Sequence, residues 1–416
     1  MKTKKKQPDV RLHTVHGYTV VLMTTSTQMI AVQCGINSGF VHETQETSGV
    51  NHLLEHVLTD SWTKCGTNCS EYWNKKGVVM NASTDETMLK YFTNGLEEDL
   101  VEMVDYIITI SDHPTFKHAS FVQEKEAVID ELLTYGRDPE SKVDDVFNKN
   151  FYTEPGLQYK DDWKLQIKNL KTLTEDDMKA AYNEHYNTKN TVFLVSGAFN
   201  PRRVLSIFEQ KLKKKQGGVA CEPYCFSNVH KILYLKHESP TTVLVLGFPS
   251  DVLLHEEDAS YISPIIHMVD NILFDTLRTK HRLIYSTDMS PTSNTCGTVV
   301  RLKLYIRDVN IVKCMRLVSE VFTHYTTHPF PVTAMRAAKK VELAHFYTAV
   351  DTGANYLLQM VAKIPTDSTK VFTLSERMAA VKSMDAATAT RVFNRLFRLN
   401  RSLCVYQGGT DVHLKF

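Results

Sequence analysis

The sequence predicts an α+β fold of two structurally repeated domains, each a mainly antiparallel sheet with helices packed on it. Three observations support this prediction. Strands and helices are mixed along the chain in an order that favours sheets with helices on one face. A stretch with a lysine run, two glycines and a proline interrupts the pattern at 211–226, and the order of strand, strand, loop and helix then starts again. We expect domains at 1–212 and 229–416, joined by a linker at 213–228.

The first half begins with two β-rich, alternating segments at 18–23 and 29–36, which indicate adjacent strands. A loop at 37–48 leads into a short helix that carries the strongest functional signal. A strand pair, several helices and a closing strand are then predicted at 78–91, 96–110, 117–135, 139–151, 174–186 and 191–198.

The second half repeats this order without the functional signal of the first. Strands are predicted at 231–236 and 242–248, separated by a turn at 239–240. A loop follows, and then a helix at 259–277. The second half is therefore expected to be an inactive repeat of the first.

The composition is typical of a globular protein long enough for two cores. The chain has 416 residues, of which 43% are hydrophobic and 23% charged, with a net charge of +1. That charge favours neither nucleic acid nor an anionic membrane, and no apolar run is long enough to span a bilayer. Residues 1–6 have neither secretory nor transit character, so we interpret them as a solvated tail.

The eight cysteines are scattered, which in a chain of this size indicates free thiols in a reducing compartment. Two pairs have a four-residue spacing, Cys65 with Cys69 and Cys221 with Cys225. A metal knuckle is the alternative for these pairs, although their spacing matches no strong zinc pattern.

The segment at 52–56, His-Leu-Leu-Glu-His, is the strongest functional signal. Residues four apart share one face of a helix, so His52 and His56 can bind one metal ion together. Glu55 lies beside them, where it can accept a proton from a water at the metal's open position. This is the H-x-x-E-H pattern of metal-dependent hydrolases. The alternative is a helix with two histidines and a solvated glutamate.

A catalytic zinc site usually has three protein ligands, and we expect the third on the helix at 117–135. The apolar arc of this helix is predicted at Phe121, Val122, Val128, Ile129, Leu132, Leu133 and Tyr135. Glu124 and Glu131 share one margin of the arc, where an unpaired carboxylate is costly. Their partner is expected to be either a zinc ion or a lysine or arginine.

Together these residues resemble the inverted-motif zinc peptidases of the pitrilysin, insulin-degrading enzyme and mitochondrial processing peptidase family, most closely its short, processing-peptidase-like members. In that family the third ligand is a glutamate some 75 residues after the second histidine, supported by a glutamate seven residues earlier. Glu131 lies 75 residues after His56, and Glu124 is in the supporting position. The resemblance therefore implies that His52, His56 and Glu131 bind one Zn²⁺ per chain, with Glu55 as the base.

Two further segments carry the resemblance. Residues 77–84 resemble an edge strand that receives the substrate backbone, which implies that Asn81 and Ala82 contact the peptide. Residues 277–285 resemble a segment whose arginine and tyrosine hold the substrate carbonyl, which implies catalytic roles for Arg278 and Tyr285. On composition alone, these two would be an ordinary surface arginine and a half-buried tyrosine.

The resemblance implies a zinc endopeptidase that cleaves short or unfolded peptides in a chamber closed by its two halves. It also implies pairing with a second chain, as a homodimer or as a heterodimer with a related chain. The expected location is the cytoplasm, with the mitochondrial matrix as the alternative. Two rival functions stay open. One is a non-catalytic structural subunit of a hetero-oligomer. The other is a weakly catalytic peptide-binding subunit, since Ser83 and Ile284 depart from the family pattern.

Overall fold

The computed structural model describes residues 8–66, 68–213, 230–253, 256–293, 297–354, 374–412 and 414. These form two compact units that interleave along the chain. Unit 1 comprises 1–134, 163–222 and 345–376, and unit 2 comprises 135–162, 223–344 and 377–416. The predicted linker, apart from Lys213, lies outside the described residues, so the predicted boundaries at 212 and 229 stay a prediction.

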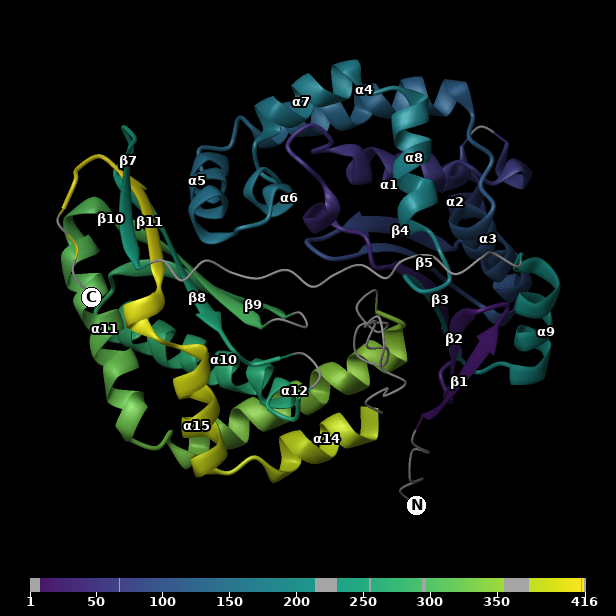
Figure 1. Cartoon of the computed structure of the whole chain (residues 1–416). Helices are drawn as coiled ribbons and strands as arrows, with labels where there is room; N and C mark the ends of the chain where they lie inside the picture. The colour runs from purple at the N-terminus through teal and green to yellow at the C-terminus, as the bar shows by residue number, and fades with distance from the viewer. Residues whose placement is uncertain are drawn as a thin grey trace. The chain divides into compact units, whose positions relative to one another are not determined.

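Unit 1 is built on a six-stranded sheet with the strand order β1-β2-β6-β3-β5-β4 (Figure 1). Neighbouring strands are antiparallel except β2 and β6, which are parallel. The strands are β1 Asp9–Val15, β2 Tyr18–Thr24, β3 Ile30–Ile36, β4 Val79–Thr84, β5 Leu89–Gly95 and β6 Thr191–Gly197. β4 is an edge strand, because it pairs with β5 alone among the described strands.

Helices pack on one face of this sheet. They are α1 Val50–Thr59, α2 Cys69–Lys76, α3 Leu100–Asp112, α4 His118–Tyr135, α7 Trp163–Thr172, α8 Glu175–His185 and α9 Pro201–Lys211. Alternate strand residues such as Val20 and Val32 point toward them and join Leu53 and Leu54 of α1 in one hydrophobic core. This alternation follows from the two-residue period of a strand, which gives a sheet one face for each set of side chains.

The other face of the unit 1 sheet is covered by the end of α12, Val332–Thr352. The side-chain amide of Gln33 donates hydrogen bonds to the carbonyls of Gly353, at 3.3 Å, and Ala354, at 2.8 Å. A Cβ atom on Gly353 would lie 2.5 Å from that of Ala31, so only glycine permits this close approach.

Unit 2 is built on a five-stranded sheet with the order β7-β11-β8-β10-β9. Its strands are β7 Lys231–Lys236, β8 Thr241–Ser250, β9 Ile284–Ser293, β10 Thr298–Arg307 and β11 Leu403–Gly408. β7 and β11 are parallel, and the remaining pairs are antiparallel. Apart from β1, this repeats the order and directions of the first sheet, so the predicted structural repeat is confirmed.

Both faces of the second sheet are covered. Its helices are α5 Ser141–Phe151, α6 Pro155–Gln158, α10 Ala259–Phe274, α11 Ile311–Thr327, α14 Leu374–Ser383 and α15 Ala386–Leu396. α10, α11 and α15 lie on one face and α5 on the other (Figure 1). Leu246 of β8 belongs to the core with α10, α11 and α15, whereas a Cβ on Gly247 would collide with Phe147 of α5. None of the described helices combines the length and the apolar composition that a membrane span requires.

The prediction that all cysteines are free thiols is wrong for one pair. Cys65 and Cys69 form a disulfide, because their Cα atoms lie 4.9 Å apart, within bonding range. Cys34, Cys314 and Cys404 are buried outside any disulfide. The other three cysteines, Cys221, Cys225 and Cys296, lie outside the described residues.

Candidate metal centre

The start of α1 is held by a buried carboxyl group. Gly49 precedes the helix with φ +102°, in the region that favours glycine. Glu43, only 3% exposed, accepts hydrogen bonds from the backbone N–H groups of Gly49, at 3.0 Å, and Asn51, at 2.8 Å. These bonds satisfy donors that the first turn of a helix leaves without partners. The residues that follow, including His52, therefore start from a fixed position.

The two histidines of α1 lie at the rim of the core of unit 1, because the helix buries Leu53 and Leu54 between them. The rings of His52 and His56 are nearly perpendicular, with centroids 4.9 Å apart. Glu131, from α4, lies beside both rings. Its Oε2 is 3.3 Å from Nε2 of His52 and 3.7 Å from Nε2 of His56. The structure thus brings together the three residues predicted as metal ligands.

The second glutamate on α4 lies behind this group. Oε2 of Glu124 is 3.1 Å from Nδ1 of His56, and both side chains are largely buried. A carboxylate can only accept here, so Nδ1 donates, which leaves the lone pair of Nε2 free on the side facing Glu131. The rim glutamates therefore contact histidines rather than a lysine or arginine.

The electrostatics of the group favour positive charge. Burial alone would lower the pKa of His56. The hydrogen bond to Glu124 and the charges of Glu55 and Glu131 outweigh this effect and raise the pKa above its ordinary value. The hydrogen bond with His52 lowers the pKa of Glu131 against the opposing effect of its partial burial. Three carboxylates around two imidazoles thus create a field that attracts a cation.

The donor set fits a zinc ion. Two imidazole nitrogens and a carboxylate oxygen are a usual set for catalytic zinc. One ligand atom from each of His52, His56 and Glu131 lies within 4.8 Å of the others. With zinc–ligand bonds of about 2.0–2.2 Å, two ligands of a tetrahedral ion lie about 3.3 Å apart. The observed separations of 3.3 and 3.7 Å match this spacing.

Glu55 projects from the same helix and is held by a residue that the sequence analysis did not single out. The Thr84 hydroxyl, at the end of β4, donates a hydrogen bond of 2.6 Å to Oε2 of Glu55. The only sequence signal for this contact is the position of Thr84 at the end of the segment that resembles the family's edge strand.

The predicted peptide contacts lie on the same strand as Thr84. Asn81 and Ala82 are in β4, and Asn81 is exposed, with its side-chain oxygen accepting a hydrogen bond from the Ala82 N–H at 2.8 Å. A strand at the edge of a sheet has backbone groups that can pair with another extended chain.

Arg278 and Tyr285, predicted to contact the substrate, lie together in unit 2. Arg278 belongs to a π-helical turn, Asp275–Lys280, and donates a hydrogen bond of 3.1 Å to the carbonyl of Ile284. Its guanidinium carbon lies 5.3 Å from the centre of the Tyr285 ring, a cation–π contact. Tyr285 is 77% exposed rather than half-buried.

The predicted apolar arc of α4 is wrong at two positions. Phe121, Val128 and Leu132 are buried as expected, but Val122 is 48% and Leu133 40% exposed. The buried stripe of α4 is therefore narrower than the sequence suggests, because the helix contacts the core along one seam. Glu131, beside that seam, has a side chain that is 58% exposed.

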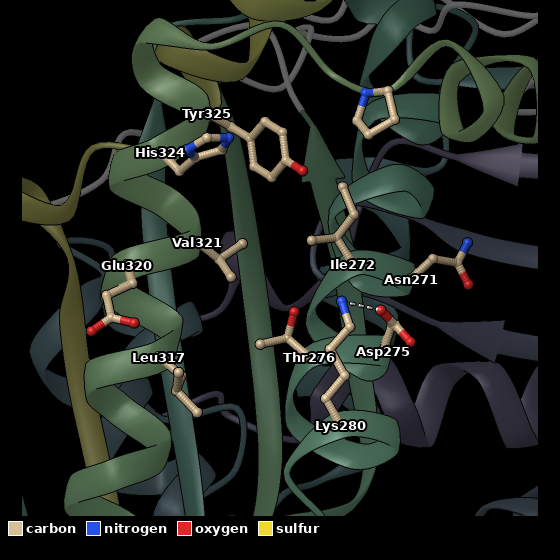
Figure 2. Close-up of a pocket in the computed structure, with 11 residues that line it drawn as sticks. Asn271, Ile272, Asp275, Thr276, Lys280, Leu317, Glu320, Val321, His324 and Tyr325 are labelled. Atoms are coloured by element: carbon tan, nitrogen blue, oxygen red, sulfur yellow. Dashed lines mark ion pairs between the residues drawn. The ribbon is translucent and has the colours of Figure 1, made fainter.

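A separate cavity of about 510 Å³ lies in unit 2 between α11 and the segment of α10 with its π-helical turn (Figure 2). Its lining includes the carboxylates of Asp275 and Glu320. Asp275 pairs with Lys280 at 2.8 Å, and Glu320 pairs with Arg316 at 2.6 Å. Both carboxylates are thus engaged in ordinary surface ion pairs, and we assign the cavity no role.

Comparison with known proteins gives two consecutive family matches. Residues 19–160 match insulinase (peptidase family M16), and residues 172–341 match the peptidase M16 inactive domain. The zinc protease YmxG of Bacillus subtilis, described as uncharacterized, is 26% identical over 280 residues, or 65% of this chain and 67% of the relative. The mitochondrial-processing peptidase subunit beta of Dictyostelium discoideum is 24% identical over 50% of this chain and 44% of its own length. The chain thus spans about two thirds of one relative and less than half of the other.

Solved structures match over nearly the whole chain. A peptidase M16 inactive domain from Pseudomonas fluorescens aligns with a TM-score of 0.83 and 16% identity, covering 98% of this chain and 100% of that one. This likeness confirms the predicted fold of two sheet-and-helix domains. The family matches extend over both halves, and the chain therefore belongs to the insulinase-type M16 family of zinc peptidases.

Proposed function

We infer that this chain is a zinc endopeptidase that hydrolyses bonds in short or unfolded peptides. The observation that supports this most strongly is the convergence of His52, His56 and Glu131 with their ligand atoms within 4.8 Å, beside Glu55. A carboxylate next to a His₂Glu site is the arrangement that metal-dependent peptide hydrolysis requires.

Each side chain of the site has a distinct role in the proposal. Zinc, when bound, polarises the substrate carbonyl and lowers the pKa of a water molecule. Glu55 accepts the proton of that water and delivers it to the leaving amine. Glu124 holds the His56 ring through Nδ1, which fixes the direction of Nε2. Thr84 holds the Glu55 carboxylate through its hydroxyl.

The substrate class follows from the edge strand. β4 lies next to Glu55 through the Thr84 contact, so a peptide that pairs with β4 would extend past the base. Strand addition requires an extended backbone, which short or unfolded peptides provide and folded proteins do not. Asn81 and Ala82 are the proposed contacts on β4, and Arg278 and Tyr285 are proposed to stabilise the oxyanion.

A second candidate function is a non-catalytic or weakly catalytic subunit. The likeness to a protein named as a subunit favours it. In either function we propose that the chain pairs with a copy of itself or with a related chain. A cytoplasmic location stays our proposal, with the mitochondrial matrix as the alternative.

Cleavage of an unfolded, fluorescence-quenched peptide separates the two functions. We expect the zinc-loaded chain to cleave it, Glu55→Gln to retain zinc without cleaving, and Glu126→Gln to behave as wild type. Glu126 is a suitable control because it is an exposed glutamate on α4. A wild-type chain that binds the peptide and zinc but releases no fragments would favour the subunit function.

A further inference from the structure

The disulfide between Cys65 and Cys69 lies in the segment that leaves the metal-binding helix α1. Cys65 ends a short helix, Thr63–Cys65, and Cys69 is the first residue of α2. The carboxylate of Asp60, which follows the last residue of α1, accepts a hydrogen bond of 2.8 Å from the Cys69 N–H. This hydrogen bond thus closes a loop that starts directly after the helix carrying His52 and His56, and the disulfide links Cys65 to Cys69 within that loop.

The same loop also holds the start of α4, the helix that carries Glu124 and Glu131. The ammonium group of Lys117, directly before α4, donates hydrogen bonds to the carbonyls of Asp60, at 2.8 Å, and Gly66, at 2.7 Å. The Thr115 N–H donates to the carbonyl of Ser61 at 3.2 Å. Residues 60–66 therefore connect the end of α1 to the start of α4, and we call this segment the joint.

Opening the disulfide acts on this joint. Gly66 is bonded directly to Cys65, so the disulfide restrains the carbonyl that Lys117 contacts. Once Cys65 is released, Lys117 keeps its hydrogen bond to the Asp60 carbonyl, but the Gly66 carbonyl, its second acceptor, is less restrained. The two helices that supply the metal ligands are then held together less firmly.

We propose that Cys65 and Cys69 are a reversible thiol–disulfide site, exchanged by monothiols and their disulfides such as glutathione, whose oxidised form holds α1 and α4 together and strengthens zinc binding. The coupling to zinc rests on the function proposed above. The disulfide belongs to the same unit as the zinc ligands and touches none of them, so it acts through the joint alone.

The exchange chemistry is consistent with the surroundings of each sulfur. Cys65 is half-buried and Cys69 buried, so an external thiolate attacks Sγ of Cys65 and Sγ of Cys69 leaves as a thiolate. Cys69 lies at the positive end of α2, which favours that thiolate, whereas the Asp60 carboxylate nearby opposes it. A second monothiol then takes Cys65 out of the mixed disulfide. Overall the protein disulfide and two thiols give two protein thiols and one small-molecule disulfide. The freed Cys65 thiol has an acceptor at hand, because its sulfur lies 2.9 Å from the carbonyl oxygen of Trp62.

The test uses the full chain, equilibrated without oxygen in buffers of reduced and oxidised glutathione. Alkylation and mass spectrometry give the redox state of the pair, and competition with a chelator gives the zinc affinity after glutathione is removed. We expect the oxidised chain to bind zinc about tenfold more tightly than the reduced chain. The double variant Cys65→Ser/Cys69→Ser should match the reduced chain in every buffer. Lys117→Met should bind zinc with the same lowered affinity in both redox states.

Cys314→Ala is the matched control, because it removes a buried thiol from unit 2 and should keep the redox difference. Equal zinc affinity of oxidised and reduced wild type would overturn the coupling, as would a pair that does not change redox state across the buffers. A second zinc ion bound by reduced wild type but not by the double variant would also overturn it. In that event Asp60, Cys65 and Cys69, whose ligand atoms lie within 4.8 Å, act as metal ligands. A chain that binds no zinc in either state would refute the proposed function itself.

Discussion

Nδ1 of His56 lies 3.1 Å from Oε2 of Glu124, across 68 residues of sequence. This contact ties α1 to α4 and sets the direction of the opposite ring nitrogen, which faces Glu131 at 3.7 Å. The two helices therefore form one frame for the metal ligands. A substitution at Glu124 should change the zinc affinity although it removes no ligand.

Glu124→Ala should weaken zinc binding by roughly 10- to 100-fold, because His56 loses the acceptor that orients its ring. Glu124→Gln keeps an acceptor oxygen without the charge and should have an intermediate effect. Zinc affinity, measured by chelator competition, checks both, with Glu126→Gln as the control. Wild-type affinity in Glu124→Ala would show that the contact does not support the site.

Thr84→Val should lower kcat by about tenfold while zinc content stays at the wild-type level, because Glu55 loses the hydroxyl that orients it. Steady-state kinetics and metal analysis on the same samples measure both quantities. Thr84→Ser keeps the hydroxyl and should restore kcat. An unchanged kcat in Thr84→Val would show that this hydroxyl does not orient Glu55.

Glu43 should make stability depend on pH. Burial raises its pKa from 4.5 to about 8, although the hydrogen bonds from Gly49 and Asn51 oppose the shift. Between these values the folded chain keeps a proton that the unfolded chain has lost. The stability contributed by this proton is complete below the unfolded-state pKa of 4.5 and is lost as pH rises through the folded-state pKa of about 8. The free energy of unfolding should therefore fall by at most about 1.4 kcal/mol per pH unit in this interval.

Glu43→Gln cannot ionise and should lack this contribution to the slope. Urea unfolding of wild type and variant across the interval measures the difference between them. Parallel pH dependences for the two proteins would mean that Glu43 does not titrate as described.

Arg278→Ala and Tyr285→Phe should each reduce turnover by one to two orders of magnitude and leave zinc bound, since their proposed role is to stabilise the oxyanion. Steady-state kinetics with metal analysis on the same samples check this. Because Arg278 also packs over the Tyr285 ring, the double variant should lose less than the product of the single effects. Loss of zinc from Tyr285→Phe would contradict the proposal that Tyr285 stabilises the oxyanion and takes no part in zinc binding.

Local periodicity predicts which site residues share a face of the same helix. The spacing of His52 and His56 places them on one helix face, and the helical wheel of α4 puts Glu124 and Glu131 on one margin. That Glu131 meets the two histidines is implied by the resemblance to the family and not by periodicity. The contact of Thr84 with Glu55 depends on how an edge strand meets a helix, and no local pattern encodes that.

The rest of the fold depended on contacts that are distant in sequence. Gly353 packs on Ala31, and Phe147 packs on Gly247, so segments from other parts of the chain complete each unit. Periodicity describes one element at a time and cannot indicate which sheet such a segment covers. For the same reason the helical wheel of α4 predicts burial at Val122 and Leu133, which are exposed.

The most direct test of the account is the zinc content of wild type and Glu131→Gln, measured by elemental analysis after dialysis against a weak chelator. We predict about one zinc per chain for wild type and less than about a tenth of that for the variant, because the variant replaces the only ligand that α4 supplies. Equal zinc in both proteins, or none in wild type, would contradict the assignment of His52, His56 and Glu131 as the metal site.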